Sequence, residues 1–360
     1  MEVLHINQTS NRAYYELIMG DSEQSLKHVF HKKWIEFLNS IDLPYVKAIQ
    51  LRIGSHLRPL LVYWGSAMGA KRIEDFNIEV ATEVAICVEI MHKVSVIVDD
   101  LIDCDTQRHH KTTFHIQYSP NETIIFAVYM LGNAFEILNS ITAGGIALQN
   151  ERLDLYAKTL NKMATGCLHE LKLNQKTRFD IRKIADIISM ETSTLIKNSV
   201  LLGFLTNDSL APEIRNLGEE IGDQVGYIFQ VMNDLEPFSS PKNIEFHKGE
   251  LNADFNRSRK NIVMAYLYGA CNIKEKDKLL QIEGNSESIG YIFELCDKYK
   301  VFDLVTADLY ALEIKTECLL DKLALYDINR ICLENFYIFF QEIMSLGKAR
   351  LKTQIQIPID

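Results

Sequence analysis

Apolar residues recur at helical spacing along most of the chain. The stretch Val80–Val98 (VATEVAICVEIMHKVSVIV) is apolar on almost every side and too long for a strand, which predicts a helix buried among other helices. The same pattern predicts further helices over residues 13–40, 57–68, 122–140, 151–173, 181–206, 211–234, 259–271, 286–324 and 334–348. The polar segment 237–253 breaks the pattern and is predicted to be a loop.

Composition agrees with a helical fold. The 360 residues are 47% hydrophobic and include only 17 glycines and 7 prolines, so long uninterrupted helices are favoured over many short strands and turns. No repeat, low-complexity linker or shift in composition marks a domain boundary. The sequence therefore predicts an all-α protein, with residues 1–360 forming a single helical bundle.

Charge and cysteine content restrict the partners and the compartment. A net charge of -10 disfavours nucleic acid as a partner, but it leaves room for a local cationic pocket. The seven cysteines form no CxxC pair, which favours a reducing compartment, and no signal peptide is recognisable in the first residues, so we expect a cytoplasmic location. The most apolar window, Ile124–Leu148, contains several polar residues and is interpreted as a core helix rather than a membrane span.

Two groups of oxygen ligands follow apolar helices. Asp99, Asp100 and Asp103 end the first helix as DDLID, and positions 99 and 103 lie on one helix face. Crowded carboxylates repel one another, and Mg²⁺ bridging to a phosphate is their natural counter-ion. Far downstream, Asn233 and Asp234 end a second apolar helix. Facing each other across a bundle, the two groups could hold one diphosphate through shared metal ions.

Six segments in order resemble the trans-polyprenyl diphosphate synthase family, which includes farnesyl and geranylgeranyl diphosphate synthases. The resemblance covers about residues 50–265. The family motif DDxxD, followed by an Arg-Arg-Gly segment, matches DDLIDCDTQRHHKTTFH, and His92 matches a histidine before it. GCLHEL is similar to GQxxDL, with Glu170 as the acid, and Thr192 falls on the threonine of a Lys-Thr pair. FQVMNDLEPF, with Gln230, is similar to FQxxDDxxDF, and DFNRSRKNIV to DLxxGKxTLP, with Arg259 at the lysine.

The resemblance implies the isoprenoid-synthase bundle with a central active-site cavity. It also implies an allylic prenyl diphosphate as substrate, about two or three Mg²⁺ ions bound with it, and a homodimer. The implied metal ligands are Asp99, Asp100, Asp103, Asn233 and Asp234. The implied catalytic residues are Asp99, Asp100, Asp103, Arg108 and Asp234. The implied substrate-binding residues are Arg58, His92, Arg108, Thr192, Gln230 and Arg259.

Departures from the family pattern concentrate on the site for isopentenyl diphosphate. The family segment GGKxxRP is IGSHLRP here, so Arg58 is kept while Ser55 replaces the lysine. His109 replaces the second arginine of the Arg-Arg pair, and Glu191 replaces the lysine of the Lys-Thr pair. Losing charge-assisted hydrogen bonds weakens the binding of a diphosphate, so we predict an eroded isopentenyl-diphosphate site beside a retained allylic site.

The expected chemistry is ionisation of an allylic diphosphate. Mg²⁺ and Arg108 assist the leaving group, and a dry pocket, with Ser95, Met91 and Val88 toward its floor, protects the carbocation. Three outcomes stay open. The chain is a prenyltransferase of the polyprenyl synthase family, or it is a terpene synthase or a prenyltransferase to another acceptor. The third alternative is a non-catalytic partner subunit of an active synthase, which the altered second motif and Glu191 favour and the retained DDLID opposes.

Overall fold

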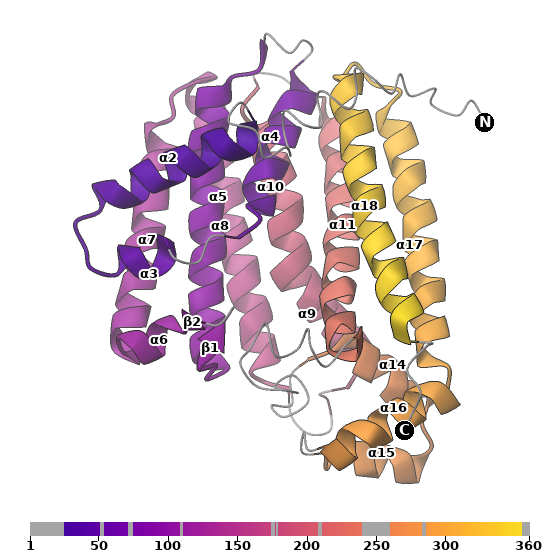
Figure 1. The fold of residues 1–360 in the computed structure, drawn as a ribbon. Coiled ribbons are helices and arrows are strands. Elements are labelled where there is room, and N and C mark those ends of the chain that lie inside the picture. The colour runs from indigo at the N-terminus through magenta and orange to yellow at the C-terminus, as the bar shows by residue number, and fades with distance from the viewer. Residues whose placement is uncertain are drawn as a thin grey trace.

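The computed structural model describes residues 25–50, 54–70, 75–108, 111–173, 177, 179–207, 211–239, 260–282 and 286–354. In this part of the chain, long helices stand side by side in a bundle, and shorter helices close its lower end (Figure 1). The helices of the first half are α2 (Leu26–Ser40), α3 (Val46–Gln50), α4 (Leu57–Gly69), α5 (Ile78–Ile102), α6 (Phe114–Gln117), α7 (Pro120–Ser140) and α8 (Gly145–Glu170). Those of the second half are α9 (Ile181–Ile188), the π-helix η2 (Ser189–Ser193), α10 (Thr194–Phe204), α11 (Pro212–Ser239), α14 (Ile262–Ala270), α15 (Ile273–Leu279), α16 (Ser286–Lys298), α17 (Val301–Leu323) and α18 (Arg330–Gln354). The all-α prediction is confirmed.

Short polar side chains start several of these helices. Asn77 accepts a hydrogen bond from the N–H of Val80 at the start of α5, and Ser119 accepts one from the N–H of Glu122 at the start of α7. Pro120 occupies the first turn of α7, where its missing N–H costs nothing. These caps explain why the apolar helices begin where the sequence pattern begins.

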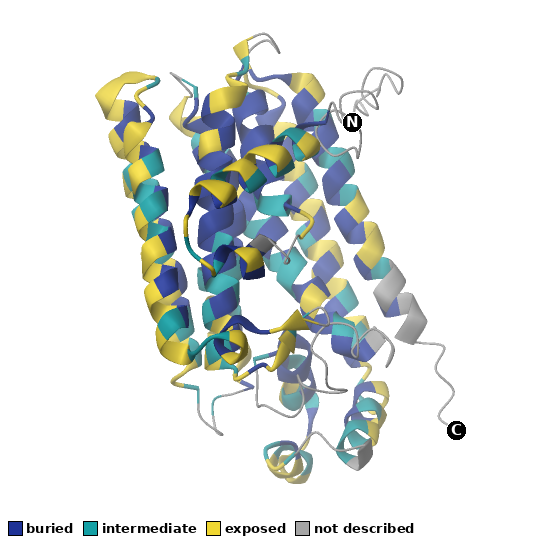
Figure 2. Cartoon of the chain, turned by 60° about the vertical axis from the view of Figure 1, so that its left-hand side comes forward, coloured by how far each residue is buried: buried dark blue, intermediate teal, exposed yellow. Residues whose placement is uncertain are grey.

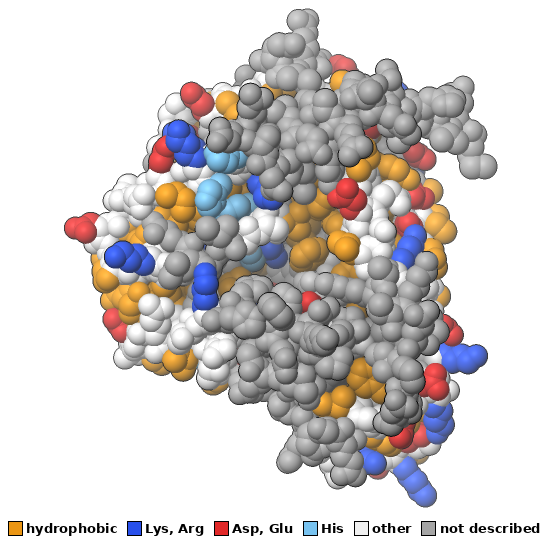
Figure 3. All heavy atoms as spheres, in the orientation of Figure 1, with side chains coloured by type: hydrophobic (Ala, Val, Ile, Leu, Met, Phe, Trp, Pro, Cys, Tyr) orange, Lys and Arg blue, Asp and Glu red, His pale blue; other side chains and the backbone are white. Residues whose placement is uncertain are grey.

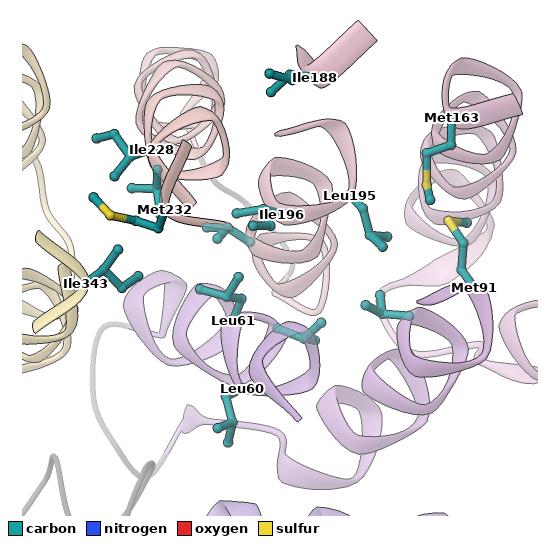
Figure 4. Packing of buried hydrophobic residues seen from close by; sticks show 14 of the residues in the cluster. Leu60, Leu61, Met91, Met163, Ile188, Leu195, Ile196, Ile228, Met232 and Ile343 are labelled. Carbon is teal, nitrogen blue, oxygen red and sulfur yellow. The ribbon is translucent and has the colours of Figure 1, made fainter. Parts of the chain in front are cut away.

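The core lies where α4, α5, α10 and α11 meet. Figure 2 shows buried residues concentrated on the faces that the helices turn toward one another, with exposed residues on the outside. In Figure 4, Leu61 of α4, Ile196 of α10 and Ile228 of α11 lie in one layer, with Met232 and Ile343 beside them. The predicted burial of the helix over 80–98 is confirmed, because most of α5 is buried.

Several boundaries differ from the predictions. The helix predicted over 286–324 is two helices, α16 and α17, because Lys300 takes a left-handed conformation with φ 50°. Pro237, predicted to begin a loop, lies within the last turn of α11, and residues 240–253 are outside the described part. A helical arm over 13–40 was predicted, of which the described part begins at Leu26, after the N-cap Ser25. The apolar pattern did not predict α3, α6, α15 or the hairpin of β1 (Gln107–Arg108) and β2 (Lys111–Thr112).

Helix α7 carries an exposed apolar stripe. Its outward residues include Ile124, Ile125, Val128 and Tyr129. By length and composition α7 is the one described helix that reaches the criteria for a membrane span, but a single such helix is weak evidence. The interpretation of Ile124–Leu148 as a core helix is therefore wrong for this face of α7, because only 33% of its apolar window is buried.

Candidate active site

The first acidic cluster lies at the C-terminal end of α5. Asp99 and Asp100 occupy the last turn, and Asp103 is the C-cap residue, whose N–H donates to the carbonyl of Asp99 at 2.9 Å. The side chain of Asp99 is half exposed, whereas that of Asp100 is completely buried. The helix thus turns one carboxylate toward solvent and encloses the next.

Arg108 binds two carboxylates of this cluster from the hairpin β1–β2. Its Nε donates to Oδ1 of Asp100 at 2.5 Å, and its Nη2 donates to Oδ2 of Asp99 at 3.2 Å. Burial lowers the pKa of Arg108, but the charges of Asp100 and Asp99 outweigh burial and raise it. The guanidinium therefore stays charged beside the acidic cluster, as its predicted contact with a diphosphate requires.

The second predicted group lies near the end of α11. Asp234 is buried, and its two carboxylate oxygens accept hydrogen bonds from Nε2 of Gln230 and from the N–H of Ile262, both at 2.7 Å. Thr192 donates to Oε1 of Gln230 at 2.9 Å. These bonds fasten η2 and the start of α14 to the end of α11, while Asn233 is exposed.

A third cluster joins these two groups, and its centre is the ammonium of Lys260. The Nζ atom donates to Glu170, the last residue of α8, and to Oε2 of Glu191 in η2 at 2.5 Å. Gly166 makes room for Glu191, since a Cβ at this glycine would lie 2.7 Å from Cγ of Glu191. Lys260 directly precedes Asn261, whose side-chain amide donates to the carbonyl of Asp234 at 2.9 Å.

Burial and neighbouring carboxylates together raise the pKa values of two acids at this place. Burial raises the pKa of Glu191 to about 7, with Lys260 opposing and Glu170 and Asp99 adding to the rise. Burial also raises the pKa of the Cys167 thiol to about 11, again with help from Glu191, Glu170 and Asp99. Asp99 of α5 is therefore close enough to act on α8 and η2. Figure 1 shows the ends of α5 and α11 at the same, lower end of the bundle.

Arg58 and His92, both predicted to bind substrate, contact each other. Nη1 of Arg58 lies 3.2 Å from Nε2 of His92. Since a guanidinium can only donate, Nε2 of His92 accepts and the imidazole is neutral. Burial first, and then the charge of Arg58, hold the pKa of His92 well below its usual range.

A buried charge network lies next to this pair. Glu89 accepts a hydrogen bond from Nδ1 of His56 at 3.3 Å and forms an ion pair with Lys93 at 3.4 Å. A Cβ at Gly54 would lie 3.7 Å from Nζ of Lys93, so this ammonium reaches the segment in which Ser55 replaces the family lysine. Nε2 of His56 lies 3.3 Å from Nδ1 of His31 in α2, and Figure 3 shows histidine side chains gathered over that helix.

Comparison with known proteins decides the family. The sequence model of the polyprenyl synthetase family matches residues 44–296 of this chain. The chain belongs to the polyprenyl synthetase family. The three clusters described above all lie within the matched range, so the predicted resemblance is confirmed.

Named members of the polyprenyl synthetase family are distant relatives in sequence. A farnesyl diphosphate synthase of Buchnera aphidicola is 27% identical over 210 residues, which cover 56% of this chain and 68% of the relative. A geranylgeranyl diphosphate synthase of Saccharolobus solfataricus is 24% identical over 299 residues, which cover 77% of this chain and 86% of the relative. The crystal structure of a geranylgeranyl pyrophosphate synthetase from Pyrococcus horikoshii superposes with a TM-score of 0.78 at 20% identity, and the match covers 92% of this chain and 99% of the solved chain. This polyprenyl synthetase therefore has the isoprenoid-synthase helical fold.

In this polyprenyl synthetase the predicted site residues form three groups. The structure brings together Asp99, Asp100 and Arg108, then Thr192, Gln230 and Asp234, and then Arg58 and His92. Arg259 and His109 are outside the described residues. Sequence reasoning missed Lys260, Glu89 and Lys93. The signals were present, because Lys260 follows Arg259 directly and Glu89 and Lys93 are charged residues one turn apart within the apolar stretch of α5.

Proposed function

We propose that this polyprenyl synthetase binds an allylic prenyl diphosphate at the lower end of its bundle, ionises it and transfers the prenyl group. The observation that supports the proposal is the convergence of carboxylates from several elements. Asp99 and Asp100 come from α5, Glu170 from α8, and Glu191 from η2. Arg108 and Lys260 balance part of this negative charge, and cations that arrive with a substrate would balance more of it.

The donors at this end suit Mg²⁺. Among the residues that the structure describes, no group of three His, Cys, Asp or Glu side chains is placed to hold a metal ion. The carboxylate and amide oxygens at this end are hard donors of the kind that Mg²⁺ binds together with phosphate oxygens. We propose Asp99, Asp100, Asp103, Asn233 and Asp234 as ligands of about two or three such ions, which when bound neutralise the diphosphate leaving group. The hydrogen bonds from Gln230 and Ile262 fix the orientation of the Asp234 carboxylate.

The protein's own groups would act on the two ends of the substrate. Arg108, held between Asp99 and Asp100, donates to the diphosphate oxygens on which charge develops. The prenyl tail requires dry surroundings, and the buried side chains of Met91 in α5 and Met163 in α8 point toward each other, with Leu195 beside them (Figure 4). Flexible thioether side chains adapt to tails of different shape, so we place the tail along these residues.

We also propose a cytoplasmic homodimer. All seven cysteines are free thiols, which supports a reducing compartment. The apolar stripe on α7 supports a partner that covers it, because contiguous exposed apolar surface is typical of subunit interfaces. A two-fold dimer buries the same stripe on both copies.

Variants of Asp100 test the proposed function. The purified protein is incubated with Mg²⁺ and each allylic diphosphate, with and without isopentenyl diphosphate, and both released diphosphate and prenyl products are quantified. Asp100→Ala is expected to abolish turnover, because one metal loses a ligand and Arg108 loses one of its two carboxylate partners. Asp154→Ala is the control, since Asp154 pairs only with Lys158 on the exposed face of α8. Unchanged diphosphate release by Asp100→Ala would refute the assignment.

A further inference from the structure

Lys260 is largely buried, which is unusual for a lysine side chain. Its side chain is 14% exposed, and its ammonium bridges carboxylates from two different elements, α8 and η2. The two carboxylates raise the pKa of Lys260 against the opposing effect of burial, so the side chain stays charged. Removing an ammonium from water is costly, and a pair of ion contacts is what makes this placement tolerable.

The cluster around Lys260 is still short of positive charge. Two carboxylates share one ammonium, and Asp99 adds its charge from α5. Within the described structure, Oε1 of Glu191 is buried and accepts no hydrogen bond. A buried carboxylate oxygen that accepts no hydrogen bond is stabilised when a cation or a hydrogen-bond donor binds next to it, as would happen when a ligand enters the site.

The position of the ammonium also explains the departure at residue 191. Glu191 extends from η2 into the space beside Gly166, with Lys260 Nζ 2.5 Å beyond its carboxylate oxygen. A lysine side chain reaches farther from the same Cα than a glutamate does. An ammonium carried by residue 191, where the resembling family has a lysine, would therefore come close to the place that Nζ of Lys260 occupies.

We propose that Lys260 and Glu191 form an exchanged charge pair in which Lys260 presents the cation to the diphosphate and the two carboxylates hold it in place. Lys260 is then a substrate-binding residue, and Glu170 and Glu191 are positioning residues. The proposal rests on the function proposed above. It makes Glu191 a support of the allylic site rather than part of the erosion of the isopentenyl-diphosphate site.

The test compares two double variants that remove the same ion pairs. In Glu191→Lys with Lys260→Met the ammonium returns from the opposite side, whereas in Glu191→Met with Lys260→Met no ammonium remains. The probe is inorganic pyrophosphate with Mg²⁺, measured by titration calorimetry. We expect the lysine-containing double variant to bind pyrophosphate about ten-fold or more tightly than the methionine double variant. Equal affinities would overturn the proposal.

Single variants complete the cycle. Lys260→Met is expected to weaken pyrophosphate binding about ten-fold or more, and Lys260→Arg to keep it within a few-fold. Lys197→Met is the matched control, because Lys197 is also buried and also bridges two carboxylates, Glu219 and Asp223, but outside the site. It is expected to lower the melting temperature while leaving pyrophosphate affinity unchanged, and an equal loss of affinity in both methionine variants would overturn the proposal.

The outcomes separate this inference from the proposed function. The charge exchange alone would be refuted if the wild-type protein binds pyrophosphate and turns over an allylic diphosphate while Lys260→Met leaves the pyrophosphate affinity unchanged. Wild-type protein that binds no pyrophosphate in the presence of Mg²⁺ would refute both.

Discussion

Glu89 and Lys93 are charged residues enclosed within the apolar body of α5. Burial alone would raise the pKa of Glu89, but the hydrogen bond from His56 and the charge of Lys93 outweigh it and lower the pKa to about 2. A charge pair enclosed in this way stabilises little by its presence, yet its disruption leaves an uncompensated charge. The segment that precedes α4 is thereby tied to α5, next to Arg58.

Acid should lower the free energy of unfolding in two stages, one for His92 and one for Glu89. Below pH 6.5 the unfolded chain protonates His92, while the folded state keeps it neutral. The free energy of unfolding therefore decreases as the pH decreases. Between about pH 4.5 and 2 the unfolded chain also protonates Glu89, which is still ionised in the folded state, and stability falls further. Urea unfolding between pH 3 and 7 measures both stages.

Substitution of Glu89 should weaken the second stage, to which other carboxyl groups with lowered pKa values also contribute. Glu89→Gln is expected to cost about 3 kcal/mol at pH 7, because Lys93 and His56 lose their buried partner. It should also flatten the decline of stability below pH 4.5. Glu36→Gln is the control, since Glu36 forms a solvent-exposed pair with Lys33 and should change little. A Glu89→Gln protein with the wild-type pH dependence would contradict this account.

Ser55 makes the acceptor site testable. The residue is exposed and follows Gly54, which lies close to the ammonium of Lys93. The charge of that ammonium is already partly neutralised by Glu89. Ser55→Lys adds an unshared cation and is expected to strengthen the binding of isopentenyl diphosphate about ten-fold. Steady-state kinetics should show a lower KM for isopentenyl diphosphate and an unchanged KM for the allylic substrate. Efficient elongation by the wild-type protein at micromolar isopentenyl diphosphate would show that the site is not eroded.

Where α4 and α10 cross, the backbones of the two helices lie so close that glycine is required on both. A Cβ at Gly65 would lie 2.1 Å from the carbonyl oxygen of Val200, and one at Gly203 would lie 2.2 Å from that of Val62. The clashing atoms belong to the backbone, which cannot rotate away. Close approach of these two helices therefore depends on the absence of two side chains.

Two alanine substitutions in helices should have opposite effects. Gly203→Ala forces α4 and α10 apart and is expected to destabilise the protein by about 2 kcal/mol or more. Gly290→Ala, in α16, meets nothing within 4 Å and should stabilise by about 0.5–1 kcal/mol, because alanine favours the helix. Urea unfolding at one pH measures both. A Gly203→Ala protein as stable as the wild type would show that the crossing adjusts freely.

The sequence was sufficient for elements whose cause is local. Apolar periodicity predicted the long helices, and the position of Asp99 and Asp100 at a helix end followed from the same pattern. It was insufficient where packing decides, as at Lys300, whose left-handed conformation divides the helix predicted over 286–324. The bridge from Lys260 to Glu170 and Glu191 joins residues 90 and 69 positions apart, and no local pattern encodes such a meeting.

On the scale of the whole molecule, α7 is the surface that most resembles an interface. Its exposed residues Ile124, Ile125 and Val128 follow one another at helical spacing, so they form one stripe. Ile273, at the start of α15, and Leu325, in the turn after α17, are exposed singly and belong to no such stripe. The proposed dimer therefore has one natural contact face.

A charge on that face should separate the subunits. Ile125→Lys with Val128→Lys is expected to convert the dimer to a monomer, because two unpaired ammonium groups would be buried at a two-fold contact. Sedimentation velocity measures the mass. Ile273→Lys with Leu325→Lys is the control and should leave the dimer intact. A wild-type protein that sediments as a monomer at micromolar concentration would refute the proposed assembly.

The π-helix η2 has a consequence for how this chain can change in length. A π-turn holds one residue more than an α-turn, and here the N–H of Thr194 bonds to the carbonyl of Ser189, five positions back. Loss of one residue between Ser189 and Ser193 would restore a regular helix and leave α9 and α10 in register with their neighbours. The same deletion would rotate Glu191 and Thr192 relative to Lys260 and Gln230. This turn is thus a place where a one-residue deletion would spare the core and displace two residues of the site.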